Sequence, residues 1–174
     1  MSNLKVAIMY ESMTGNTKML ADAIKDVLNN QVIYSGKYDL EIAADIYFLG
    51  SWVDKGSKNT FNLFNDFSHK NIAIFGTCGF NKFDYTNRLF ERAKSKFNLT
   101  NNILGGFYSL GKMKREARDK FIDIIKANPL DKDLDIKASD YDLNQTHPDQ
   151  NDLKNVKAWT LEMVKKVENN AYKR

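Results

Sequence analysis

Short apolar runs alternate with longer segments of helical periodicity along this chain, and this alternation most limits its possible folds. The apolar runs occupy residues 6–10, 32–34, 46–49, 72–75 and 103–108, the last interrupted by two glycines. The helical periods occupy residues 16–29, 57–67, 85–97, 113–127 and 155–167. Each apolar run lacks polar alternation, as do strands that are buried on both faces of a parallel sheet. The pattern therefore predicts an α/β fold with helices on both faces of a parallel sheet and right-handed crossovers.

The length of 174 residues fits one domain. We expect residues 1–174 to form a single domain, with an extra helix and loop at about 112–150 before the C-terminal helix. Pro129 and Pro148 bracket the long part of this segment that lacks helical or strand periodicity. We interpret it as an ordered excursion and not as a linker between domains.

One cysteine and two histidines rule out an internal disulfide framework and a multi-cysteine zinc or iron–sulfur site. No run approaches the ~20 apolar residues that a membrane span needs. The N-terminal segment lacks the small-residue cleavage site of a secretory signal. We therefore expect a cytoplasmic protein with no membrane span and no metal centre.

The positive charge of the chain is concentrated in its middle. Residues 61–128 carry 12 basic and 6 acidic side chains, whereas residues 1–60 and 129–174 each carry one more acid than base. The denser basic cluster and groove-reading motifs of a nucleic-acid-binding protein are missing. Solvated helix faces explain the excess better, and we expect no nucleic-acid partner.

The segment that follows the first apolar run is rich in hydroxyl groups and leads directly into a helix. Its sequence is Glu-Ser-Met-Thr-Gly-Asn-Thr at residues 11–17. Backbone N–H groups, hydroxyls and the positive end of the helix dipole would together hold a phosphate. The segment is neither a Walker loop nor a dinucleotide-binding glycine motif. On these residues alone, a phosphate site and an ordinary helix cap remain equally open.

Two further loops follow the third and fourth apolar runs, where parallel sheets bind their ligands. Residues 50–56 read Gly-Ser-Trp-Val-Asp-Lys-Gly, and residues 76–80 read Gly-Thr-Cys-Gly-Phe. Each loop carries an aromatic ring beside glycines, which suits a flat heteroaromatic ligand next to a phosphate. Taken singly, Trp52 fits a rim residue that packs on its own loop, and Phe80 fits an anchor at the edge of the core.

Together, these loops resemble those of the flavodoxins. The run Tyr10 to Thr17 is similar to the phosphate loop of that family, and the other two loops match in order and position those that hold the flavin ring. The Trp-Val-Asp-Lys-Gly run and His147-Pro148 are more similar to a less-studied flavodoxin-like subgroup than to the main electron carriers. The resemblance implies a flavodoxin-like three-layer sandwich, a five-stranded parallel sheet of order 2-1-3-4-5, and non-covalent FMN.

The resemblance also implies the residues of the cofactor site. The phosphate would be bound by Ser12, Met13, Thr14, Gly15, Asn16 and Thr17. Trp52 would lie against the ring, with Ser51, Val53 and Gly56 nearby. Backbone contacts and an opposing wall would come from Thr77, Cys78, Gly79 and Phe80, with Phe83 and Tyr85 as rivals for that wall. Cys78 has no Cys-x-x-Cys partner and is read as a small buried residue rather than a redox thiol.

The resemblance implies an electron carrier that shuttles electrons between a reductase and a redox enzyme, and no catalytic side chains are expected. One alternative is an FMN-dependent reductase or oxidase acting on a quinone, a tetrapyrrole or another flat anionic substrate. Another is a flavin-free receiver or binding module on the same sheet. The partner would be a redox protein with an acidic docking face, and the chain would be a monomer or weak dimer. The basic side chains near the ligand end of the fifth strand form either a docking rim for an anionic partner or substrate or a solvated outer helix face, and these are Lys112, Lys114, Arg115, Arg118 and Lys120.

Overall fold

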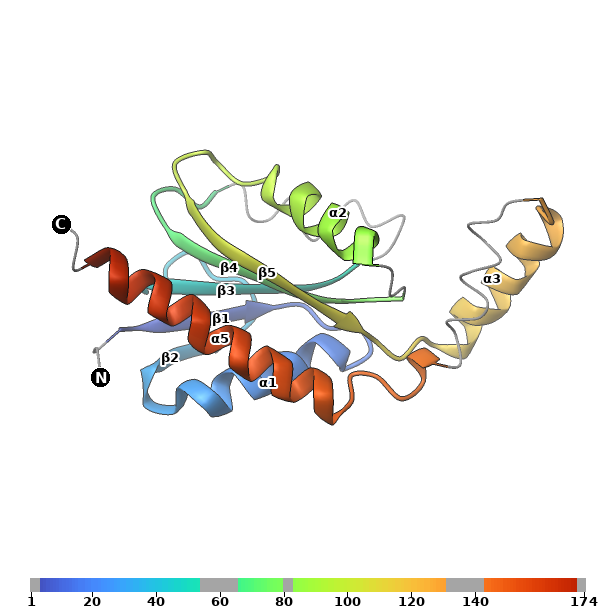
Figure 1. The fold of residues 1–174 in the computed structure, drawn as a ribbon, viewed down its shortest axis with the longest axis horizontal. Coiled ribbons are helices and arrows are strands. Elements are labelled where there is room, and N and C mark those ends of the chain that lie inside the picture. The colour runs from blue at the N-terminus through green and yellow to red at the C-terminus, as the bar shows by residue number, and fades with distance from the viewer. Residues whose placement is uncertain (1–3, 54–65, 80–82, 131–142, 172–174) are drawn as a thin grey trace.

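The computed structural model describes residues 4–53, 66–79, 83–130 and 143–171. Its five strands form one parallel sheet in the order β2-β1-β3-β4-β5 (Figure 1), so the predicted fold class is confirmed. The strands are β1 Val6–Tyr10, β2 Val32–Gly36, β3 Ile46–Val53, β4 Asn71–Cys78 and β5 Asn102–Leu110. The helices are α1 Asn16–Leu28, the short 3-10 helix η1 Asn29–Gln31, α2 Phe83–Lys94, α3 Arg115–Ala127 and α5 Gln150–Ala171.

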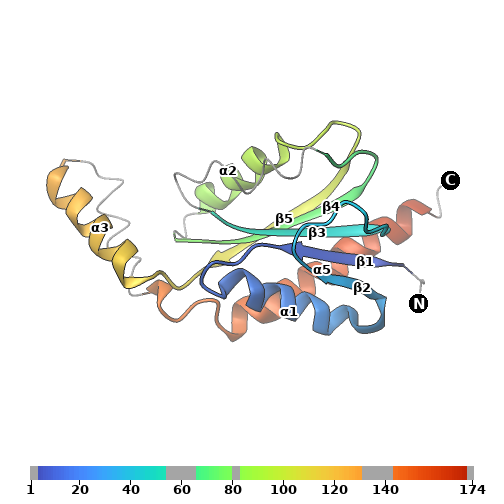
Figure 2. The same ribbon diagram turned by 180° about the vertical axis from the view of Figure 1, so that it is seen from behind.

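The sheet separates two apolar layers. Helices α1 and α5 lie side by side on one face, and α2 lies over the other face (Figure 2). Val6 and Ile8 face α1 and α5, whereas Ala7 and Met9 face the opposite layer. All four side chains are fully buried. This explains why β1 is apolar at every position, and burial of each large side chain contributes about 1.5–3 kcal/mol.

Strands β3 and β4 extend beyond the ends predicted from their glycines. The expectations that β3 ends at Gly50 and β4 at Gly76 are wrong, because β3 continues to Val53 and β4 to Cys78. A Cβ atom at Gly50 would lie 2.2 Å from the Phe75 ring on the neighbouring strand. This glycine therefore allows close packing inside a strand and does not terminate it.

The helix predicted at 57–67 falls largely outside the described residues, and Phe67 itself is not helical. Phe67 is nevertheless buried, with its ring centroid 5.1 Å from that of Tyr47. Helix α2 ends at Lys94, three residues before the predicted end, although Phe97 remains buried. The strand predicted as two runs around Gly105 and Gly106 is continuous as β5.

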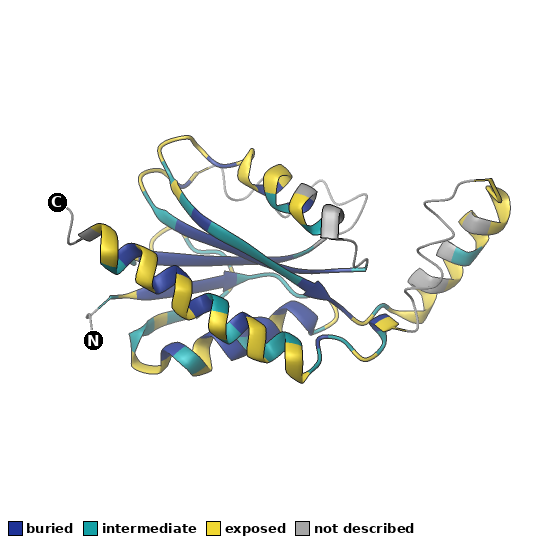
Figure 3. Cartoon of the chain, in the orientation of Figure 1, coloured by how far each residue is buried: buried dark blue, intermediate teal, exposed yellow. Residues whose placement is uncertain are grey.

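Helix α5 is longer than the periodicity predicted, with 22 residues against the expected 155–167. One stripe of it is buried against the sheet and the other is exposed (Figure 3). Helix α3 comes between β5 and α5 in sequence and projects away from the sandwich in both views (Figures 1 and 2). No helix in the described ranges has the length and apolar character needed to cross a bilayer.

Candidate functional site

The candidate site lies where the central strands end. Trp52 pairs with Thr77 on the next strand, and Thr77 pairs with Ser109 on the one beyond. The N–H of Glu11, just after β1, donates to the carbonyl of Gly50 at 3.1 Å. Since parallel strands end at the same edge, the segments singled out in the sequence meet at the carboxyl edge of the sheet. We call this the ligand edge.

The loop at residues 12–17 turns at Gly15 and opens helix α1. Gly15 has φ +88°, a left-handed conformation that disfavours any residue with a Cβ. The N–H of Lys18 donates to the Ser12 hydroxyl at 3.2 Å, so this hydroxyl caps the first turn. No acidic residue lies in that turn, and Met13 and Thr14 are exposed. The helix N-terminus is therefore open to an anion.

Asn16 and Thr17 use their side chains to hold this loop in place. The Asn16 amide donates to the Thr14 hydroxyl and to the Lys112 carbonyl, both at 2.8 Å. The hydroxyls of Thr17 and Thr77 lie 3.2 Å apart. Both Asn16 and Thr17 are buried. Their expected contribution to phosphate binding therefore falls to their backbone N–H groups.

Gly111 comes directly after β5 and lies close to the loop at 12–17. Its N–H donates to the carbonyl of Cys78 at 3.0 Å. An added Cβ would lie 2.8 Å from the Asn16 amide nitrogen and 3.0 Å from the Thr77 Cβ. The strand order 2-1-3-4-5 predicts that Gly111 follows the fifth strand at the ligand edge, and the structure places it there.

At the end of β3, Ser51 is buried and Trp52 is partly buried. The Ser51 hydroxyl donates to the Trp52 carbonyl at 2.7 Å, which restrains the peptide next to the indole ring. Val53 is the last residue of β3. Gly56 lies outside the described residues, and its expected role stays a prediction.

At the end of β4, Thr77 and Cys78 are buried and Gly79 is partly buried. The Cys78 thiol donates to the Ser109 carbonyl at 3.6 Å. Phe80 lies outside the described residues. Phe83 and Tyr85 lie in the first turn of α2, within the described backbone. Which of the three aromatic residues forms the wall of the site stays a prediction.

Asn144 is a site residue that the sequence reading missed. It is fully buried, and its amide donates to the Gly79 carbonyl at 2.8 Å. Its Oδ1 is buried and has no hydrogen-bond partner among the residues that the structure describes. Asn144 lies in the aperiodic stretch before α5, and no local pattern marks it. It fixes the backbone of the loop after β4 from a position 65 residues later in the chain.

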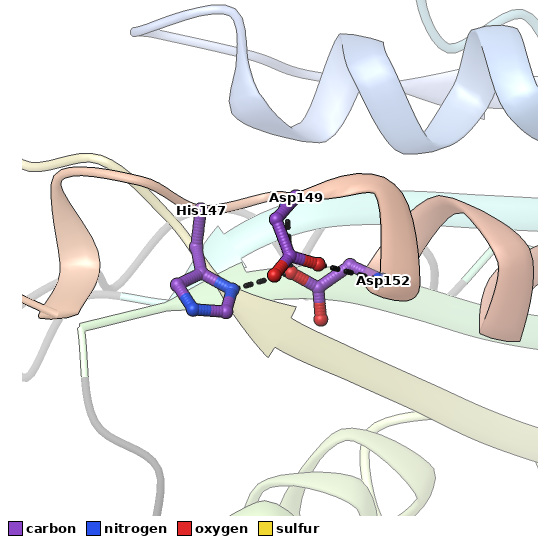
Figure 4. Close-up of side chains that lie close together, drawn as sticks. All are labelled: His147, Asp149 and Asp152. Carbon is purple, nitrogen blue, oxygen red and sulfur yellow. Dashed lines mark hydrogen bonds and ion pairs between the residues drawn. The ribbon is translucent and has the colours of Figure 1, made fainter.

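His147, Asp149 and Asp152 form a polar cluster where the chain enters α5 (Figure 4). The Asp149 carboxylate accepts from the Asp152 N–H at 3.0 Å, and the Asp152 carboxylate accepts from the Asp149 N–H at 2.9 Å. This reciprocal pair is a capping box, and it explains why α5 begins before the predicted position. The Asp152 N–H is also the main reason that the pKa of Asp149 lies below its usual value.

The cluster also connects α5 to the ligand edge. The His147 Nδ1 lies 2.5 Å from the Asp152 carboxylate, and the Lys112 N–H donates to the His147 carbonyl at 2.8 Å. Ligand atoms of the three residues lie within 4.8 Å of one another, as a metal site would require. Both carboxylates are already used in capping, so the geometry is explained without a metal. His69, the other histidine, is exposed.

Known proteins share this architecture and sequence pattern. A model of the flavodoxin domain matches residues 7–160. The chain is 31% identical over 176 residues to the flavodoxin-like domain-containing protein BilS of Clostridioides difficile strain CD3, covering 94% of this chain and 98% of the relative. It is 29% identical over 172 residues to BilS of Clostridium symbiosum strain WAL-14163, covering 86% and 90%.

Solved flavodoxins have the same fold. Oxidised flavodoxin 2 from Bacillus cereus superposes with a TM-score of 0.57 at 17% identity, covering 93% of this chain and 99% of the other. The flavodoxin of Streptococcus pneumoniae TIGR4 gives a TM-score of 0.55 at 15% identity, covering 92% and 98%. Because the domain model spans most of the chain and the strand order agrees, this protein belongs to the flavodoxin domain family.

Proposed function

We propose that the chain binds FMN without a covalent bond and transfers electrons between redox proteins. The observation that carries the proposal is the meeting of an acid-free helix N-terminus with the ends of β3 and β4 at one edge of the sheet. When bound, the flavin supplies the electron chemistry. The chain binds it, orients it and controls its surroundings.

The phosphate would lie in the loop at residues 12–17. Its N–H groups and the dipole of α1 favour an anion, typically by 0.3–1 kcal/mol or about 2 kcal/mol where partly buried. Nearby Lys18 is held by Asp22 at 2.6 Å along the helix surface, which raises the pKa of Lys18. Phosphate binding therefore rests on the backbone and hydroxyls more than on this lysine.

The ring system would lie at the ends of β3 and β4. Trp52 is partly buried there, and its backbone pairs with that of Thr77, two residues before Gly79. An aromatic side chain of this exposure provides a flat apolar surface for stacking. The bonds from Ser51 to the Trp52 carbonyl and from Asn144 to the Gly79 carbonyl fix the backbone on both sides.

The described side chains at this edge favour a carrier over an enzyme with its own general acid. Cys78 is 4% exposed, which leaves its thiol poorly placed to donate a proton to a bound ligand. Burial raises the pKa of the Tyr108 phenol well above its usual value. Protons that accompany reduction would then come from solvent, as a carrier requires no positioned acid.

Anaerobic reductive titration of the FMN-loaded chain tests the proposal. A carrier takes up the electrons of one flavin per chain and delivers them to protein acceptors, with negligible steady-state turnover of quinones or tetrapyrroles. Rapid multiple turnover of either small molecule would instead establish the FMN-dependent reductase or oxidase. A chain that takes up no FMN would contradict both functions.

A further inference from the structure

Three basic residues within four positions follow β5 at the ligand edge. Lys112, Lys114 and Arg115 are all exposed. Within the described residues, none of the three forms an ion pair with an acid. With Met13, which is 62% exposed, they form what we call the rim patch.

The rim patch directly adjoins the loop expected to bind phosphate. One Asn16 amide donates to both the Thr14 hydroxyl and the Lys112 carbonyl, which places the backbone of Lys112, the first residue of the patch, beside Thr14. On its other side, Lys112 is tied to the His147 carbonyl. The cations are therefore anchored where electrons would enter and leave.

Asp149 and Asp152, the described acids that follow His147, form no ion pair with the cations of the rim patch. Asp149 and Asp152 are each used by backbone N–H groups of α5, and Asp152 also binds His147. Helix α3 itself is almost balanced, with four basic and three acidic side chains. Within the described residues, the positive excess therefore lies at Lys112, Lys114 and Arg115, where α3 begins, and not along the helix as a whole.

We propose that the rim patch docks the acidic face of a protein redox partner. This inference rests on the proposed electron-transfer function and adds the chemistry of the partner. Exposed Met13 and Arg115 are residue types that are enriched in protein interfaces. Unpaired cations at the edge of an electron-transfer site steer an acidic partner, and such steering raises association rates by about 10–10³-fold.

Stopped-flow reduction of two haem proteins tests the docking. Acidic cytochrome b5 and basic cytochrome c are mixed with the reduced FMN-loaded chain at low and high ionic strength. We expect the triple variant Lys112→Glu, Lys114→Glu and Arg115→Glu to slow cytochrome b5 reduction by about tenfold or more at low salt. The same variant speeds cytochrome c reduction, and both changes shrink in high salt.

A second triple variant serves as a matched control, which distinguishes the effect of the rim patch from the effect of net charge. Lys25, Lys96 and Lys165 are exposed and form no ion pair within the described residues. Lys25 and Lys165 lie in the C-terminal halves of α1 and α5, two helices that start at the ligand edge, and Lys96 lies before the start of β5. All three residues therefore lie toward the opposite edge of the sheet. Their reversal to Glu changes the net charge equally. Equal effects of the two triples, or no effect of the first, would overturn the docking proposal.

Direct binding keeps this test independent of the cofactor. Titration of cytochrome b5 with the FMN-free chain, followed by calorimetry at low salt, should show about tenfold weaker binding for the rim triple than for the control triple. A chain that binds no FMN but shows this difference would contradict the proposed electron transfer and retain the acidic-partner surface. A chain that binds FMN but shows no difference would contradict the surface alone.

Discussion

The side-chain amide of Asn16 donates a 2.8 Å hydrogen bond to the carbonyl of Lys112, 96 positions later in the chain. This bond joins the first loop of the ligand edge to the end of β5. The loop at residues 12–17, where the phosphate is expected, is therefore held in part by the segment just before α3.

Replacement of Asn16 by Ala should destabilise the fold and weaken FMN binding together. The change leaves the Lys112 carbonyl without its amide donor, and loss of one partner of a buried hydrogen bond costs about 1–3 kcal/mol. Urea unfolding and FMN fluorescence titration measure the two effects. Asn155→Ala, at an exposed position of α5, is the control and should change neither. Equal stability and equal FMN affinity of the two variants would show that the Asn16 hydrogen bond contributes to neither property.

Gly111→Ala should lower the free energy of unfolding by about 1–3 kcal/mol through overpacking. The new Cβ would lie 2.8 Å from the Asn16 amide and 3.0 Å from Thr77, both held inside the site. Gly36→Ala is the matched control, since its Cβ would meet the far end of the Tyr34 side chain, which can move. Chemical denaturation compares them, and an equal or smaller loss for Gly111→Ala contradicts the crowding.

Asn144→Asp tests the fixation of the Gly79 backbone. An Asp carboxylate has no hydrogen to donate, so it would face the Gly79 carbonyl oxygen in a fully buried position. A buried group left without its partner costs about 1–3 kcal/mol, and more when charged. We expect lower stability near neutral pH that is partly restored in acid. The exposed Asn151→Asp is the control. Unchanged stability and FMN affinity in Asn144→Asp would remove Asn144 from the site.

The capping box of α5 gives the fold a pH dependence. The Asp152 N–H lowers the pKa of Asp149 from 3.8, burial opposes this shift, and the Asn151 N–H and His147 add to it. A carboxyl with a lower pKa when folded stabilises the protein above its unfolded pKa, and this stabilisation is lost as the pH falls through the folded value.

Asp149→Ala should therefore lower the thermal midpoint at about pH 7, and the difference from wild type should narrow below about pH 4. Circular dichroism melts over this range measure it. Asp123→Ala, at an exposed carboxylate of α3, should show little effect at either pH. A gap between wild type and Asp149→Ala that is constant with pH would mean that the carboxylate charge is not responsible.

Periodicity predicts the sheet well because the central strands β1, β3 and β4 are buried on both faces, so each is a continuous apolar run. The same local pattern misleads at Gly50, where the glycine allows close packing of Phe75 from the next strand and does not form a turn. Local signals do not reveal a partner that is distant in sequence.

The candidate site shows the same limit. The turn at Gly15 and the hydroxyl groups after β1 are local features, and both were recognised. Asn144 bonds Gly79, which is 65 positions away, and no local pattern identifies it. The capping box at Asp149 was local and could have been read from the spacing of the two aspartates.

Comparative titration with FMN and riboflavin tests the central claim most directly. The two ligands share the ring, and only FMN carries the phosphate expected at the N-terminus of α1. We predict one FMN per chain, and riboflavin binding weaker by about 100-fold, equivalent to roughly 2.7 kcal/mol. No FMN binding, or equal affinity for the two ligands, would contradict a flavin site built on the loop at residues 12–17.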